Sequence, residues 1–153
     1  MSVISGDRDL LQLAEDKIQI RIPKTKKGVT EVENYYPEDV VALYGVTPLE
    51  FIDMKALMGD TSDNIPGAPG VGPKTASAII QKYHSVDNVL AHLDELKPPK
   101  AQKSITENAE QVKMSRFLAE ININVPLDYN IENAEIGCLL YTSPSPRDRS
   151  VSR

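Results

Sequence analysis

Residues 59–76 constrain this chain more than any other stretch, because aspartate, glycine and proline recur in them at short, fixed spacings. The stretch is GDTSDNIPGAPGVGPKTA. Asp60 and Asp63 stand three residues apart, and on a helical or turn backbone this spacing places both carboxylates on the same side. Carboxylate oxygens are the ligands that Mg²⁺ prefers in proteins. The first part of the stretch is therefore predicted to present two aspartates to one cation.

The second part of the stretch predicts a phosphate-binding hairpin. Glycine at positions 70 and 72 lets the backbone approach a partner closely, and Pro73 suits the first turn of an apolar helix. The unpaired N–H groups at such a helix N-terminus favour an anion, and nucleic acid supplies one at every phosphate. The residues predicted to contact the nucleic-acid backbone are Gly70, Val71, Gly72, Lys74 and Thr75.

Other glycine motifs fit the stretch less well. A P-loop would need its lysine directly after the second glycine, but Pro73 precedes Lys74, and no buried strand leads into the motif. A dinucleotide-binding fingerprint would need glycine at position 75, where threonine stands. An EF-hand that began at Asp60 would need glycine at its sixth position, which is Ile65. A helix-hairpin-helix motif remains, and an ordinary glycine and proline turn between two helices is the alternative.

The composition limits the classes of protein to which the chain can belong. Its 153 residues suffice for one ordinary domain or parts of two, and no apolar run approaches membrane-spanning length. We expect no secretory leader, because no charged and then apolar segment follows Met1. The one cysteine excludes an internal disulfide framework and indicates a reducing compartment, and with only two histidines it argues against zinc. The net charge of −5 argues against a wholly basic nucleic-acid binder but allows local basic contacts around an acidic centre.

The N-terminal residues predict a strand followed by a second pair of carboxylates. A short strand over residues 3–5 leads to Asp7 and Asp9, which point to the same side of an extended backbone. Carboxylates at the end of a strand lie where open α/β sheets place their chemistry. The alternative role for Asp9 is to cap the helix predicted over residues 10–14. Alternating apolar residues then predict a β-hairpin with a basic tip, and either a solvated turn or a weak phosphate contact explains that tip.

Two helices are predicted directly after the β-hairpin. Pro37 opens one that Gly45 closes, and Thr47 and Glu50 form a capping box for the next. The second helix carries apolar residues at core spacing and ends just before the first aspartate of the glycine-rich stretch. Its own Asp53 is predicted to face solvent.

The C-terminal half continues as helices. We expect helices over residues 73–84 and 86–93, and then a helical stretch that runs to about residue 121 with a break near Asn108. In this last stretch Val112, Phe117, Leu118 and Ile121 form an apolar stripe. Nearby lysines extend the basic surface beside the predicted phosphate-binding hairpin.

Three blocks in this order resemble the 5'-3' exonuclease domain of bacterial DNA polymerase I, a member of the flap endonuclease family. The blocks are SGDRDLLQL from Ser5, LMGDTSDNIPG from Leu57 and GVGPKTA from Gly70, and the likeness covers residues 1–137. It implies an α/β fold that is mostly helical. Residues 1–36 would belong to the catalytic α/β domain, and residues 37–137 would form a helix-hairpin-helix subdomain. From Cys138 the chain is rich in Ser, Pro and Arg, so we expect residues 138–153 to be a non-native, disordered tail.

The resemblance implies a divalent-metal phosphodiesterase that cuts the 5' strand of branched or nicked duplex DNA in replication and repair. The acids that match the family's catalytic and metal-binding positions are Asp7, Asp9, Asp60 and Asp63. The expected cofactor is Mg²⁺ or Mn²⁺, and in relatives the carbonyls of the hairpin hold a monovalent cation. Two divalent ions about 3.5–4 Å apart can activate water and stabilise the departing oxygen.

The resemblance also implies partners and a location. We expect double-stranded or branched DNA with a 5' end as substrate, a polymerase domain in the same intact chain, and a cytoplasmic, nucleoid-associated location away from membranes. The family's domain is longer, and its opening strand, a later carboxylate-rich segment and its basic helical arch have no counterpart here. We therefore expect DNA binding with little catalysis. The alternatives are a non-catalytic helix-hairpin-helix DNA-binding module and a Mg²⁺-dependent phosphatase-like enzyme.

Overall fold

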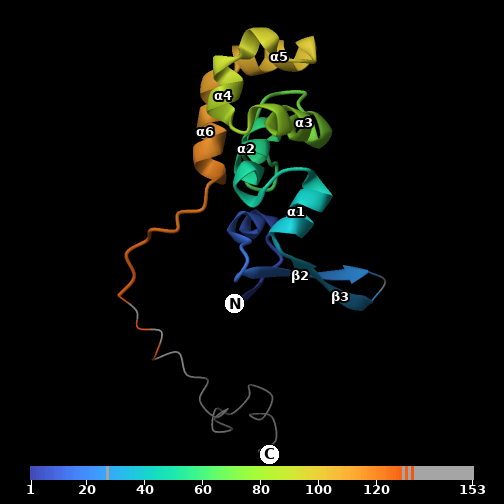
Figure 1. Ribbon diagram of the computed structural model, residues 1–153, viewed down its shortest axis with the longest axis vertical. Coiled ribbons are helices and arrows are strands. Elements are labelled where there is room, and N and C mark those ends of the chain that lie inside the picture. Colours follow the sequence, from blue (N-terminus) through green and yellow to red (C-terminus); the bar gives the residue numbers. More distant parts are fainter. Residues whose placement is uncertain (27, 129, 131, 133–153) are drawn as a thin grey trace, which may run out of the picture. The chain divides into compact units, whose positions relative to one another are not determined.

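The computed structural model describes residues 1–26, 28–128, 130 and 132, and the chain divides into two compact units, Met1–Ile121 and Asn122–Arg153. The helices and strands of the first unit are drawn in Figure 1. In chain order they are strand β1 (Ser2–Ile4), 3-10 helix η1 (Arg8–Leu13), strands β2 (Gln19–Lys26) and β3 (Val29–Tyr35), helices α1 (Pro37–Tyr44), α2 (Pro48–Met58), α3 (Pro73–Tyr83) and α4 (Val86–Ala91), 3-10 helix η2 (Leu93–Glu95), and helices α5 (Pro99–Glu107) and α6 (Ala109–Ala119).

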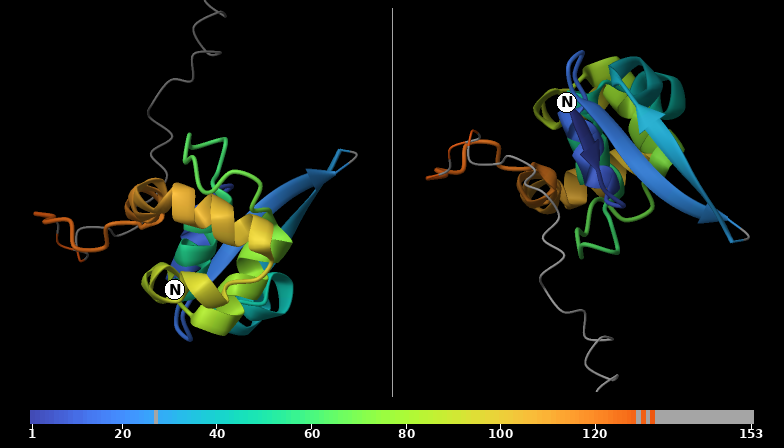
Figure 2. Two further views of the ribbon diagram at one scale, coloured as in Figure 1. Left: turned by 90° about the horizontal axis from the view of Figure 1, so that it is seen from above. Right: turned by 90° about the horizontal axis from the view of Figure 1, so that it is seen from below.

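A three-stranded sheet in the order β1-β2-β3 forms one end of the first unit. β1 pairs in parallel with β2, with Val3 opposite Ile20, and β2 pairs antiparallel with β3, with Ile22 opposite Glu33. Leu11 of η1 packs with Ile20 and Ile22 in the core. Figure 2 shows the β2–β3 hairpin extending away from the helices. The predicted fold class, α/β and mostly helical, is confirmed.

The helices begin and end at the residues that carry the expected signals. Glu50 N donates to Thr47 Oγ1 at 3.3 Å, and Thr47 N donates to Glu50 Oε2 at 2.9 Å, which is the reciprocal capping box. Gly45 ends α1 with a φ of 73°, a left-handed conformation that favours glycine. Asn108 separates α5 from α6 at the predicted break.

Helix α2 lies at the centre of the first unit and contacts η1, α1, α3, α4 and α6. Met54 and Leu57 are almost fully buried, as the spacing of apolar residues predicts. The prediction that Asp53 faces solvent is wrong, because neighbouring elements cover α2 at this position. Asp53 is 5% exposed, and its Oδ1 accepts hydrogen bonds from Arg116 Nε at 3.0 Å and from Val86 N at 3.1 Å.

Helix α6 buries a different face from the apolar stripe that its sequence suggests. Its buried residues are Val112, Ser115 and Ala119, which follow the three- and four-residue spacing of a single helix face. Phe117 and Leu118, in contrast, are 76% and 52% exposed. The side of α6 that packs against α2 is therefore lined by small residues, and the larger apolar side chains face away from the core.

The second unit is described only in its first part. Residues 122–128 form no helix or strand, and Ile123, Val125 and Leu127 are exposed. The predicted disordered tail over residues 138–153 lies outside the described residues, and the predicted domain boundary after residue 36 stays a prediction. No helix in the described part of the chain has both the length and the apolar character needed to cross a membrane.

Candidate metal centre and nucleic-acid interface

The loop between α2 and α3 presents Asp60 and Asp63. The chain turns back on itself directly after α2, because Asp60 N donates to Ile65 O and Ile65 N donates to Asp60 O, both at 2.8 Å. Gly59 and Gly67 permit this reversal, since both have positive φ and a Cβ on Gly67 would lie 2.3 Å from the backbone N of Gly59. The glycines thus hold two carboxylates beside the C-terminal end of α2.

The 3-10 helix η1 presents Asp9 to the same site. Asp7 caps this helix, with its Oδ1 accepting a hydrogen bond from Asp9 N at 2.9 Å. The alternative in which Asp9 is the cap is therefore wrong. Because Asp7 occupies the cap, the Asp9 carboxylate is free to face α2, where it lies half-buried.

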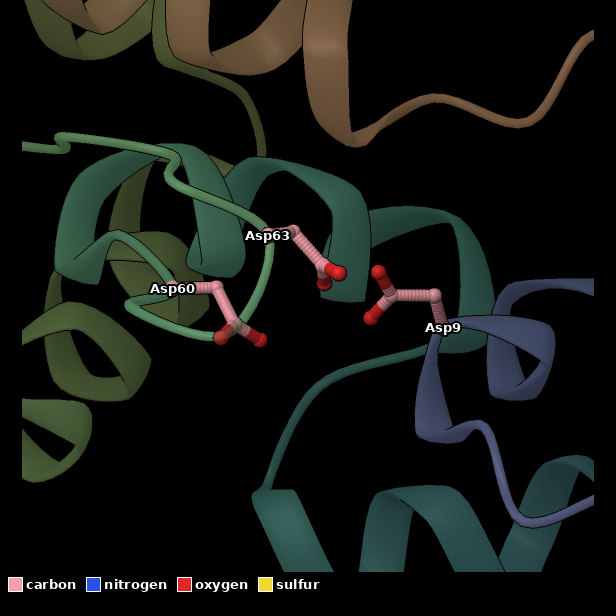
Figure 3. A group of neighbouring side chains, drawn as sticks. All are labelled: Asp9, Asp60 and Asp63. Atoms are coloured by element: carbon pink, nitrogen blue, oxygen red, sulfur yellow. The ribbon is translucent and has the colours of Figure 1, made fainter.

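Asp9, Asp60 and Asp63 converge although they come from distant parts of the chain. One carboxylate oxygen of each lies within 4.8 Å of the others. Figure 3 shows all three carboxylates pointing into one space, Asp9 from η1 and the other two from the loop after α2. Asp7 is exposed and does not belong to this group. We call Asp9, Asp60 and Asp63 the acidic cluster.

Lys55 of α2 joins the acidic cluster, and no sequence motif had singled it out. Its ammonium binds Asp9 Oδ1 and, at 2.5 Å, Asp60 Oδ2, and it lies 4.0 Å from Asp63 Oδ2. The Lys55 side chain is 7% exposed, so the ammonium is withdrawn from water and depends on these carboxylates. The signal that could have revealed it is a lone lysine within a helix of otherwise core-spaced residues.

Burial and the ion pairs shift the pKa values of Lys55 and its aspartate partners in opposite directions. Burial raises the pKa of Asp9 and outweighs the opposing effect of Lys55. The hydrogen bonds from Lys55 and Ser62 hold the pKa of Asp60 well below its usual range. Burial alone would lower the pKa of the Lys55 ammonium, but the bonds to Asp60 and Asp9 outweigh it and raise that pKa. Lys55 is therefore charged at neutral pH and acts as the cation among the three carboxylates.

The donor set of the acidic cluster fits a divalent cation. Each aspartate offers a carboxylate oxygen, the donor that Mg²⁺ and Mn²⁺ prefer. Three carboxylates and one ammonium leave two negative charges, which one divalent ion would neutralise. Within the described residues, no other three acidic, histidine or cysteine side chains lie this close together.

The glycine hairpin exposes the start of α3. Val71 is buried in the core and anchors the turn, whereas Gly70 and Gly72 on either side of it are exposed. Gly72 is the N-cap of α3, and the first intrahelical bond runs from Ala76 N to Gly72 O. The backbone N–H groups of the first turn thus precede the hydrogen-bonded part of the helix.

The predicted side chains of the hairpin lie beside this turn. Lys74 is exposed and Thr75 is half-buried. An open cavity of about 280 Å³ has both Asp60 and Pro73 in its lining. Asp60 of the acidic cluster and the N-terminal end of α3 therefore border the same cavity.

Comparison with known proteins decides the family. Residues 46–139 match the family described as "5'-3' exonuclease, C-terminal SAM fold". The chain belongs to this 5'-3' exonuclease family. The resemblance drawn from the three sequence blocks is thereby confirmed.

Relatives of known sequence and structure agree with this family. DNA polymerase I of Bacillus subtilis is 46% identical over 135 residues, which are 88% of this chain and 15% of that protein. The 5'-3' exonuclease of Bacillus subtilis is 42% identical over 134 residues, 88% of this chain and 44% of the relative. A flap endonuclease of bacteriophage T5, solved in a complex with DNA and metal ions, matches with a TM-score of 0.67 and 26% identity over 77% of this chain and 42% of its own. The chain thus spans less than half the length of each of these relatives.

Proposed function

We propose that the chain is the metal- and DNA-binding part of a structure-specific 5'-3' exonuclease or flap endonuclease that hydrolyses DNA phosphodiesters. The observation that carries this proposal is the meeting of Asp9 with Asp60 and Asp63 in a chain of the 5'-3' exonuclease family. The T5 relative in complex with DNA and metal ions supports it.

The acidic cluster would hold Mg²⁺ or Mn²⁺. Such an ion, when bound, lowers the pKa of a coordinated water and stabilises charge on a phosphate oxygen. Asp7 stays a predicted ligand, and its hydrogen bond to Asp9 N fixes the start of η1. Lys55 keeps the three carboxylates together by offsetting their mutual repulsion.

The hairpin would bind the sugar-phosphate backbone of duplex DNA. Gly70 and Gly72 allow close approach, the first turn of α3 offers N–H donors, and Lys74 adds a positive charge. Contacts of this kind carry no base information, so they select DNA by its structure. A monovalent cation at the hairpin carbonyls, as the family resemblance implies, belongs to the same proposal.

The chain by itself should bind DNA better than it cuts it. The described residues gather enough carboxylates for one ion, whereas phosphodiester hydrolysis by this class of mechanism uses two. A polymerase domain in the same intact protein and a cytoplasmic, nucleoid-associated location complete the proposal. The polymerase domain is suggested by the DNA polymerase I relatives.

A 5'-flap duplex with a fluorescent label tests the function. We expect the chain to bind it at low salt, and to cleave it slowly and only with Mg²⁺ or Mn²⁺. Asp60→Asn should abolish cleavage and leave binding largely intact. Failure to bind flap or duplex DNA would overturn the proposal. Binding with no metal-dependent cleavage at high enzyme concentration would instead identify a non-catalytic helix-hairpin-helix module.

A further inference from the structure

Helix α6 contributes no carboxylate to the acidic cluster, yet it is hydrogen-bonded to both segments that do. The first link is Gln12 of η1, a residue that is only 7% exposed. Its Nε2 donates to Asp9 O at 2.9 Å and to Ala119 O at 3.1 Å, and its Oε1 accepts from Ile121 N at 2.9 Å. One buried amide thus joins the backbone of Asp9 to the C-terminal end of α6.

The second link is Ser115, which is fully buried on α6. Its Oγ accepts a hydrogen bond from Gly67 N at 3.0 Å and donates to Gln111 O at 2.8 Å. Gln111 Nε2 donates to Gly67 O at 2.7 Å, so both backbone groups of this glycine are bonded to α6. Gly67 packs in turn against Gly59, the residue before Asp60. The loop that carries two of the three aspartates is therefore fixed to α6 as well.

We propose that Gln12 and Ser115 are positioning residues that set, through α6, the separation between Asp9 and the Asp60–Asp63 pair. This inference rests on the proposed function, because it treats the acidic cluster as a divalent-cation site. Neither residue touches the carboxylates themselves. Both act on the backbone that carries those carboxylates.

The physical need for such positioning follows from the charges. The three carboxylates repel one another. They are carried by a short 3-10 helix and by a loop, and not by one rigid element. The Gln12 amide has both N–H groups and its oxygen bonded in a buried place, so any other orientation would leave a buried polar group without a partner. The same holds for the Ser115 hydroxyl. These bonds therefore allow one arrangement of the two segments rather than a range.

Mn²⁺ binding to the whole chain, measured by electron paramagnetic resonance, tests the proposal without recourse to catalysis. Gln12→Met removes the amide at nearly constant volume, and Ser115→Ala removes a single oxygen. Each should weaken Mn²⁺ binding by up to about 10-fold, the lower end of what loss of a group bonded directly to a metal ligand costs, because Gln12 and Ser115 act one step further out, on the backbone. Val112→Ala is the matched control, because Val112 is fully buried on the same helix but makes no side-chain hydrogen bond. It should lower the melting temperature and leave Mn²⁺ affinity unchanged.

The outcomes separate this inference from the proposed function. If the wild-type chain binds no Mn²⁺, the proposed metal site fails and the positioning role fails with it. If the wild type binds Mn²⁺ and the Gln12 and Ser115 variants bind it equally well, only the positioning role is overturned. It is also overturned if Val112→Ala weakens Mn²⁺ binding as much as they do, because affinity would then follow stability alone. Should Gln12→Met fail to fold, the smaller Ser115→Ala change decides the matter.

Discussion

The Lys55 ammonium lies 2.5 Å from Asp60 Oδ2, and it also binds Asp9, so a buried lysine on the central helix connects the two segments that carry the acidic cluster. The lysine offsets one of the three negative charges of the acidic cluster, and a divalent cation would offset the remaining two. Lys55 and the cation therefore act on the same carboxylates.

Lys55→Met should therefore destabilise the metal-free protein strongly. Removing the ammonium leaves partly buried carboxylates uncompensated, which costs about 1–3 kcal/mol. Urea unfolding in EDTA measures this loss, and added Mg²⁺ should restore part of it. Lys113→Met is the control, since Lys113 is exposed and pairs with Glu110 at the surface. A Lys55→Met variant as stable in EDTA as this control would contradict the account.

Gly67→Ala should disrupt the loop that carries Asp60 and Asp63. Gly67 has a φ of +59°, and an added Cβ would meet the backbone of Gly59. A non-glycine residue in this conformation costs about 1–3 kcal/mol before the clash is counted. Thermal unfolding measures the loss. Gly6→Ala, where a Cβ would meet nothing within 4 Å, should leave the melting temperature close to that of the wild type.

Glu50→Gln should lower stability by up to about 1 kcal/mol at pH 7, because it keeps an oxygen for the capping box of α2 but removes the charged acceptor that Thr47 and His84 contact. Burial would raise the pKa of Glu50, but hydrogen bonds from Thr47 and His84 outweigh it and lower that pKa below the ordinary 4.5. A lowered pKa in the folded state gives stability that is present above pH 4.5 and is lost as the pH falls.

The difference between wild type and Glu50→Gln should accordingly shrink in urea unfolding below pH 4.5. Glu38→Gln, which removes an exposed acid from the first turn of α1, serves as the control for the loss of one surface charge at pH 7. A constant difference from pH 7 to pH 3 would refute the role of the Glu50 carboxylate.

Lys74→Ala should weaken binding to duplex DNA of any sequence. Each phosphate contact adds about 0.9 to the slope of log affinity against log salt, so this variant should reduce the slope by about that amount. Fluorescence anisotropy across a KCl series measures both quantities. Lys82→Ala, in the last turn of the same helix, should behave as the wild type does. Equal effects of the two substitutions would place the DNA away from the hairpin.

Local signals made most of the fold and half of the candidate site predictable. The capping box at Thr47, the glycine that ends α1 and the break at Asn108 depend on neighbouring residues, and each lies where the sequence indicates. The turn that brings Asp60 close to Asp63 is likewise local. The convergence of Asp9 with them was expected only through the family resemblance.

The remaining features depend on contacts between residues far apart in the chain. Lys55 meets Asp9, and Gln12 meets the end of α6, through packing that no local pattern encodes. Asp53 is buried because α4 and α6 cover α2 and supply its partners. Phe117 is exposed because α6 presents its small residues to α2. Side-chain spacing reveals a helix, but it does not reveal which face its neighbours cover.

Electron paramagnetic resonance can count the Mn²⁺ ions bound by the wild-type chain and by the variants Asp9→Asn, Asp60→Asn and Asp63→Asn, and so shows whether the acidic cluster is a metal site. Asp16→Asn, an exposed aspartate outside the acidic cluster, is the control. We expect one tightly bound ion in the wild type and in the control, and loss of that ion in each of the three cluster variants. Tight Mn²⁺ binding that survives all three substitutions would contradict this expectation.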